Sequence, residues 1–178
     1  MPDREGELDA AMWRAKVEAE VEQAESLLSQ DSRLSTPPAF SAVLVVKGRP
    51  SDADVAAGRV LSGDDGDAIR KALAALGIEG EPFCAASRPA HEADASPDAV
   101  ARRLRLLAEA VEAEAVLALD DVAAQDVARA FGLEALQPGV PVEVLGRTVL
   151  ATDDFSAALA DEASKRVVWR QLKTLVSS

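Results

Sequence analysis

Short apolar runs alternate with amphipathic segments along most of the chain. The runs of strand length are "SAVLVVK", "EPFCAAS", "AVLAL" and "VPVEVLGRTVLAT", the last of which is predicted to form a hairpin or strand pair across Gly146. The first and third runs are continuously apolar, which is typical of strands covered on both faces. The pattern therefore predicts a sheet that lies in the middle of the fold.

The N-terminal segment is predicted to form a helix over residues 5–29. Its apolar residues are assigned to one stripe, with the glutamates on the other side: Leu8, Met12, Val17, Val21, Ala24 and Leu28. Pro37 and Pro38 end any continuation, because proline disrupts a helix interior. We divide the chain into an N-terminal helix and linker, residues 1–36, and an α/β domain, residues 37–178, within one compact domain overall.

Further helices are predicted from apolar spacing and from signals at helix ends. Residues 48–61 are expected to be loop-like, and Ser62 with Asp65 then has the spacing of a capping box that starts a helix. Other helices are expected over about residues 96–113, 121–132 and 164–176.

Strands that alternate with helices favour an α/β fold, here a three-layer α/β/α sandwich with a mostly parallel central sheet. In such sheets, ligands bind beyond the carboxyl ends of the strands. The loops after Lys47, Ala86, Leu119 and Thr152 should therefore gather at one edge of the sheet, and any functional site is expected there.

Composition limits the partners and cofactor sites that the chain could have. The net charge is −12, from 31 acidic and 19 basic residues, and aromatic residues make up 3% of the chain with no tyrosine, so binding to DNA is expected to be weak or absent. The single cysteine, Cys84, rules out an intramolecular disulfide and any multi-cysteine zinc or iron–sulfur site. No segment has the pattern of a signal peptide or a membrane helix, so we expect a cytoplasmic protein without a membrane partner.

Paired aspartates precede three of the predicted helices: Asp64 with Asp65, Asp120 with Asp121, and Asp153 with Asp154. The favoured interpretation is N-capping, in which a carboxylate accepts hydrogen bonds from the free N–H groups of the first helical turn. The alternative is a Mg²⁺ or Mn²⁺ site, since hard cations prefer carboxylate oxygens. The candidate metal ligands are Asp120, Asp121, Asp153 and Asp154.

The remaining residues that could take part in catalysis or binding are interpreted as structural or solvent-exposed. His91 is expected in a solvated loop, without a partner base, and Cys84 is expected to be a buried apolar residue. The basic cluster of Arg102, Arg103 and Arg105 is interpreted as the solvent side of a helix, paired with Glu109 and Glu112. Trp13 and Trp169 are expected to be packing residues.

Four stretches, taken in order, resemble the uracil-DNA glycosylase superfamily, which includes DNA-repair enzymes. "VLVVKGRPSDADVAAGRVLSGDDG" resembles the first strand, the Gly-Glu-Ala-Pro-Gly loop and the later Gly-x-Pro-Phe-x-Gly-x-x-Gly segment. "AIRKALAALGIE" is similar to the helix that follows, and "EAVLALDDVAAQDVARAFG" to a strand and its alanine-rich helix. "TVLATDDFSAALADEASKRVVWRQLKTL" is similar to the last strand, the His-Pro-Ser loop and the terminal helix. The resemblance covers most of residues 40–176 and implies the family's α/β/α fold.

The catalytic residues that the resemblance implies are replaced. Pro50 and Ser156 match the family, whereas these residues depart from it: Gly48 for Glu, Ser51 for the last Gly of the first loop, Leu61 for the base-stacking Phe, Asp154 for the catalytic His and Phe155 for Pro. The middle strand "EPFCAASRP" lacks the Asn that reads uracil. A carboxylate beside a developing uracil anion opposes the reaction.

We therefore expect a non-catalytic, diverged member of the family that binds a small ligand or a protein, with no cofactor and no iron–sulfur cluster. Its pocket is predicted to include Gly48, Arg49, Pro50, Leu61, Gly63, Asp154 and Ser156. One alternative is an altered base-excision glycosylase in which Asp52 or Asp54 replaces the lost carboxylate. The other is a Mg²⁺-dependent hydrolase that uses the aspartate pairs. The N-terminal helix is a candidate docking element, and the sequence leaves the oligomeric state open.

Overall fold

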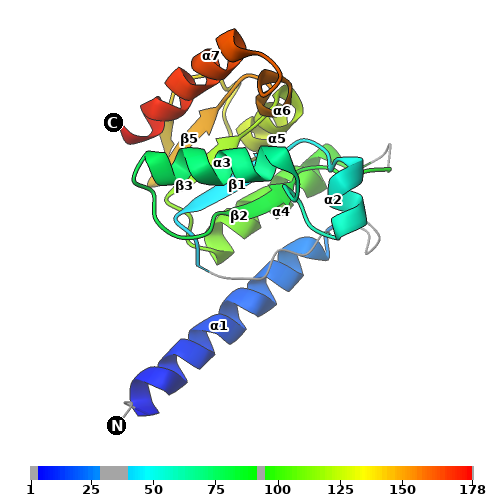
Figure 1. Cartoon of the computed structure of the whole chain (residues 1–178). Helices are drawn as coiled ribbons and strands as arrows, with labels where there is room; N and C mark the ends of the chain where they lie inside the picture. Colours follow the sequence, from blue (N-terminus) through cyan, green and yellow to red (C-terminus); the bar gives the residue numbers. More distant parts are fainter. Residues whose placement is uncertain (1–3, 29–39, 92–94, 178) are drawn as a thin grey trace.

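The apolar runs form a five-stranded sheet with the strand order β2–β1–β3–β5–β4. The computed structural model describes residues 4–28, 40–91 and 95–177 (Figure 1). The strands are β1 (Val43–Lys47), β2 (Phe83–Ala86), β3 (Ala115–Ala118), β4 (Val142–Val144) and β5 (Arg147–Ala151). All neighbouring strands are parallel except β4, which pairs with β5 as the antiparallel edge of a hairpin.

Helices cover both faces of the sheet. They are α1 (Arg4–Glu25), α2 (Asp52–Ala57), α3 (Asp64–Ala75), α4 (Pro97–Ala110), α5 (Asp121–Ala130), α6 (Phe155–Ala158) and α7 (Glu162–Lys173), followed by a 3₁₀ turn, η2 (Thr174–Val176). Because side chains alternate along a strand, Leu44 and Val46 pack against α1, α4 and α5, while Val43 and Val45 pack against α3 and α7. The predicted α/β/α sandwich with a mostly parallel sheet is confirmed.

The helix starts around β1 differ from those predicted. Residues 52–57 form α2 instead of a loop, and the capping box lies at Ser51 and Asp54. The predicted capping box of Ser62 and Asp65 is wrong, because α3 begins after Gly63 without a side-chain cap. Ser62 instead donates its hydroxyl to Asp54.

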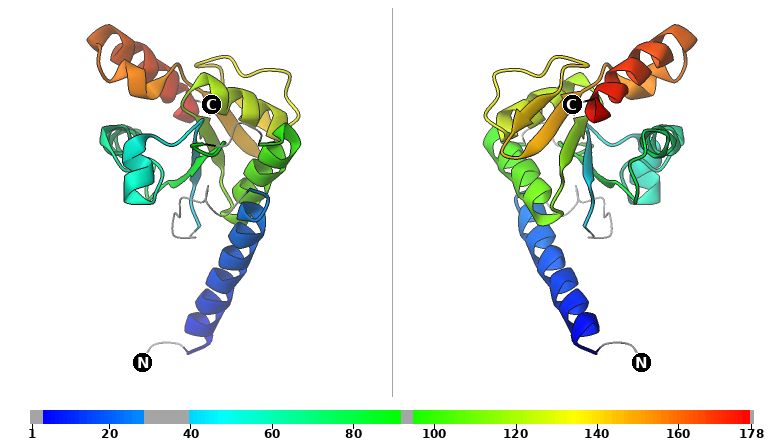
Figure 2. Two further views of the ribbon diagram at one scale, coloured as in Figure 1. Left: turned by 90° about the vertical axis from the view of Figure 1, so that its right-hand side faces the viewer. Right: turned by 90° about the vertical axis from the view of Figure 1, so that its left-hand side faces the viewer.

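The single apolar stripe predicted along α1 is also wrong. Leu8 and Met12 are 63% and 68% exposed, whereas Val17 is 2% exposed. Leu8 and Val17 are nine residues apart, which is about two and a half turns of an α-helix, so they lie on opposite faces. The C-terminal half of α1 packs on the domain, Trp13 makes an edge-to-face contact with Phe40, and the start of the helix projects away from the domain (Figure 2).

A buried arginine fixes the C-terminal half of α1 to the sheet. Arg103 of α4 lies 2.8 Å from Glu25 and donates a hydrogen bond to the carbonyl of Ala86 at the end of β2. Arg103 is 5% exposed, so its predicted place on the solvent side of the helix is wrong. Arg105 does pair with Glu109, as predicted.

Other predictions have mixed outcomes in the part of the chain that the structure describes. Cys84 is buried and His91 is exposed, as predicted. Trp13 and Trp169 are 50% and 36% exposed, so both are less buried than packing residues should be. The predicted linker after the first helix, with Pro37 and Pro38, lies outside the described residues. None of the described helices is long and apolar enough to cross a membrane.

Candidate functional site

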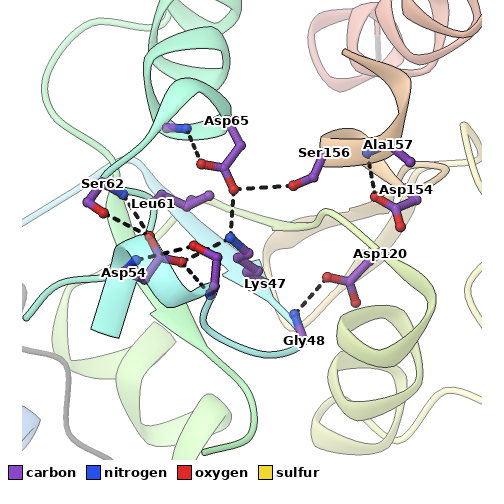
Figure 3. Close-up of polar contacts among 12 residues, drawn as sticks. Lys47, Gly48, Asp54, Leu61, Ser62, Asp65, Asp120, Asp154, Ser156 and Ala157 are labelled. Carbon is purple, nitrogen blue, oxygen red and sulfur yellow. Dashed lines mark hydrogen bonds and ion pairs between the residues drawn. The ribbon is translucent and has the colours of Figure 1, made fainter. Parts of the chain in front are cut away.

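The carboxyl ends of the parallel strands meet at one edge of the sheet, as predicted. The backbone N–H of Ser87 donates to the carbonyl of Lys47, which ties the loop after β2 to the end of β1. The N–H of Phe155 donates to the carbonyl of Leu119, which ties the loop after β5 to the end of β3. Charged side chains from these loops and from the starts of α2, α3, α5 and α6 therefore converge here (Figure 3).

Lys47, the last residue of β1, lies at the centre of this edge. Its Nζ is 2.9 Å from Oδ2 of Asp54 and 2.6 Å from Oδ2 of Asp65. Burial alone would lower the pKa of Lys47, but the hydrogen bonds and charges of the two carboxylates outweigh it, and the pKa is raised. Lys47 is therefore held as a cation between two anions and is unsuited to act as a nucleophile.

Asp54 is completely buried and saturated with hydrogen-bond donors. Besides Lys47, it accepts bonds from the backbone N–H of Ser51, from the N–H of Ser62 and from the Ser62 hydroxyl. Burial would raise the pKa of Asp54, but these hydrogen bonds outweigh it and lower the pKa to about 2. Asp54 is thus a carboxylate that stays ionised at neutral pH, with no face open to a substrate.

Asp65 extends this network from β1 to the last helices. Its Oδ1 accepts a hydrogen bond from the backbone N–H of Gly66, and its Oδ2 accepts one from the Ser156 hydroxyl at 3.2 Å as well as the bond from Lys47. Asp54, Lys47, Asp65 and Ser156 therefore link α2, β1, α3 and α6 in one chain of polar contacts (Figure 3). With two carboxylates and one ammonium, this network carries a net negative charge.

Asp120 joins the loop after β1 to the start of α5. Its Oδ1 caps α5 by accepting from the N–H of Ala123, and its Oδ2 accepts from the N–H of Gly48, both at 2.8 Å. A Cβ atom added at Gly48 would lie 2.5 Å from Oδ1 of Asp120 and 2.7 Å from Cβ of Val122. The backbone at Gly48 therefore leaves no room for any larger residue unless its neighbours move.

Asp153 and Asp154, the acidic pair after β5, have separate roles. Asp154 caps α6 by accepting from the N–H of Ala157. The carboxylate of Asp153 accepts from the side-chain amide of Gln171, and its backbone N–H donates to the same side chain. Capping is therefore confirmed for Asp154 and Asp120, whereas Asp153 anchors α7. Among the described residues, no group of three or more acidic, histidine or cysteine side chains is arranged to hold a metal ion.

The residues of the predicted pocket have different surroundings in the structure. Leu61, which matches the base-stacking position, is completely buried in the core beneath α3, so it is closed to a ligand in this structure. Arg49 donates a hydrogen bond to the carbonyl of Pro89. Asp154 lines a cleft of about 340 Å³ together with Asp153 and Val167.

A further polar cluster was not predicted from the sequence. Asp126 on α5 is 4% exposed and accepts hydrogen bonds from the Ser87 hydroxyl and from both Nε and Nη2 of Arg88. An aspartate on the buried side of an amphipathic helix was the only signal that could have revealed it. The cluster fixes the loop after β2, and its Arg88 and Asp126 line a cleft of about 530 Å³ along α5.

Comparison of the sequence with protein-family models and with curated proteins gives no match. The membership in the uracil-DNA glycosylase superfamily predicted from the motifs therefore stays a prediction.

Proposed function

We propose that this chain is a diverged member of the uracil-DNA glycosylase superfamily that excises no base and acts as a binding module for a small ligand or a protein. The observation that carries the proposal is the role of Asp154. This residue matches the position of the family's catalytic His, and its carboxylate caps α6.

Electrostatics at that corner oppose base excision. Cleavage of the glycosidic bond leaves negative charge on the departing base. In the uracil-DNA glycosylase superfamily, the catalytic histidine stabilises this charge. Asp154 would add a negative charge at this point, and the Lys47 network, with Asp54 and Asp65, is itself net negative. Negative charges near a developing anion raise the free energy of such a transition state, an effect that solvent weakens at the exposed Asp154.

The loop after β1 supports the same conclusion. The family's Glu corresponds to Gly48, where a side chain would collide with Asp120 and Val122. Asp54, which we considered as a replacement carboxylate, is buried and fully hydrogen-bonded, so it has no free lone pair to orient a water molecule. Asp52 is exposed in the first turn of α2.

A base-release assay tests the proposal. The full chain, in excess over single- and double-stranded oligonucleotides that contain uracil or hypoxanthine, is expected to leave no abasic sites, while an active glycosylase serves as the positive control. The variant Asp154→His is also expected to be inactive, because Gly48 and Leu61 are unchanged, with Asp154→Asn as its matched control. Enzyme-dependent release of free base by the wild-type chain would overturn the proposal.

A further inference from the structure

The projecting half of α1 carries an apolar stripe of its own. The stripe consists of Leu8, Ala11, Met12 and Ala15, whose spacing of three or four residues places them on one helix face. All of these side chains are exposed. The stripe lies about half a turn from the buried one that begins at Val17, so it faces away from the domain.

No described segment of the chain covers this face. The N-terminal half of α1 extends beyond the sheet and the other helices in both side views (Figure 2). Leu8 and Met12 are among the most exposed large apolar side chains of the described residues. Adjacent exposed apolar residues of this size on a solvent-facing helix mark an interaction surface.

The charges beside the stripe follow an ordered pattern. Glu7 and Arg14 are seven residues apart and lie on one flank, and Asp9 and Lys16, also seven apart, lie on the other. Within residues 7–16, the acidic residue on each flank is nearer the N-terminus and the basic residue is nearer the domain, and Glu18 and Glu20 add acidic groups farther toward the domain. This surface is therefore complementary to itself when one copy is reversed.

We infer that α1 binds α1 of a second copy of this chain in an antiparallel pair centred between Ala11 and Met12. In this register, Leu8 lies opposite Ala15 of the second copy, and Ala11 lies opposite its Met12. Within residues 7–16, each acidic residue meets a basic one: Glu7 lies near Arg14 of the second copy, and Asp9 lies near its Lys16. Within each chain, Lys16 also lies 3.7 Å from Glu20. A parallel pair in register would instead place like charges at the same level.

The shape of the monomer permits this arrangement. The stripe faces away from the domain, so the two domains would lie at opposite ends of the helix pair and on its outer sides.

The contact involves a few turns of helix from each copy, which places it among small, weak interfaces. The net charge of −12 on each copy also opposes association. The dimer is therefore concentration-dependent and exchanges with the monomer.

Cysteine cross-linking tests the geometry directly. The full chain with Ala11→Cys is expected to form a disulfide-linked dimer under mild oxidation, because the two copies of residue 11 lie next to the two-fold axis. The matched control is Ala10→Cys, an exposed neighbour that lies about 100° around the helix and should remain monomeric. The native Cys84 is buried, so it does not contribute to the product.

A third position separates the antiparallel pair from a parallel one. Ala19 is exposed, and its two copies would lie roughly 20 Å apart in the antiparallel register but side by side in a parallel one. Ala19→Cys is therefore expected to give no dimer. Cross-linking at Ala19 without Ala11, equal cross-linking at Ala10 and Ala11, or no cross-linking at any position would each overturn the inference.

Charge reversal and rescue test the flanks by sedimentation equilibrium. Glu7→Lys with Asp9→Lys places like charges at all the proposed contacts and should weaken the dimer by about tenfold or more. Adding Arg14→Glu and Lys16→Glu restores the opposite charges and should recover the wild-type dissociation constant. Failure of this rescue, with helicity unchanged by circular dichroism, would count against the antiparallel register. The result is independent of base release, so the proposed function and this inference can fail separately.

Discussion

Lys47 and Asp54 form a buried ion pair, 2.9 Å between Nζ and Oδ2, at the end of β1. Asp65 holds the other side of the same ammonium. Removing the lysine would leave two carboxylates close together without their cation. Lys47→Met should therefore lower the free energy of unfolding by about 3–5 kcal/mol. Urea denaturation measures this, and Lys71→Met on the exposed side of α3 is the control, with little expected change.

The depressed pKa of Asp54 predicts a specific loss of stability in acid. Its pKa is about 2 in the folded chain against an ordinary value of 3.8, so the folded state binds its proton less readily than the unfolded state. This contribution, about 2 kcal/mol, is fully present above about pH 4 and is lost as the pH falls through 2. Denaturation between pH 5 and 2 should show a shallower loss for Asp54→Asn than for wild type. Parallel curves would contradict this assignment.

Gly48 should not tolerate even the smallest side chain. The Cβ of Gly48→Ala would lie within 3.0 Å of Asp120 and Val122, so we expect a loss of about 1–3 kcal/mol in stability. The control is Gly63→Ala, where the nearest atom to an added Cβ is 3.7 Å away and φ is −100°. Thermal melting of both variants checks the difference. Equal melting temperatures would show that the loop after β1 adjusts freely.

The contact between Arg103 and Glu25 should control how firmly α1 is held. Arg103→Ala leaves the Glu25 carboxylate and the Ala86 carbonyl without their donor, and a loss of about 3 kcal/mol is expected. The neighbouring exposed residue gives the control, Arg102→Ala, with little expected change. Hydrogen exchange should show faster exchange across residues 17–25 in the first variant alone.

The Cys84 thiol should be inert in the folded protein. Its side chain is 2% exposed, and burial raises its pKa to about 11. Thiolate attack requires deprotonation and access. Labelling with a disulfide reagent at pH 8 should therefore be slow in the native protein and complete after denaturation. Rapid native labelling would mean that β2 opens readily.

The layered fold could be predicted from the sequence because apolar periodicity reports which faces are buried. The runs ending at Lys47 and Leu119 have no polar face, so they predicted central strands, and the structure confirms them. The starts of the helices were harder to predict. Ser51 and Ser62 both precede an acidic residue by three positions, so both have the spacing of a capping box. In the structure, Asp54 accepts a hydrogen bond from the N–H of Ser51, whereas Asp65 accepts from Gly66 and Lys47, so only Ser51 forms a capping box.

Only the location of the candidate site could be predicted from the sequence. Parallel strand order places the loops at one edge, but it does not say which charges pair. Arg103 looked like part of a solvent-facing cluster because its neighbours, Arg102 and Arg105, are basic, and its partner Glu25 is far away in sequence. Long-range ion pairs of this kind leave no local pattern in the sequence.

The exposed and buried apolar stripes of α1 lie on opposite faces because of the number of residues between them. Every residue between Met12 and Val17 turns the outer face by about 100° and moves it about 1.5 Å along the axis. Inserting one residue there would redirect whatever binds at Met12 toward a different side of the molecule without disturbing the buried stripe. The number of residues in this short stretch thus sets the direction in which the exposed stripe of α1 faces relative to the sheet.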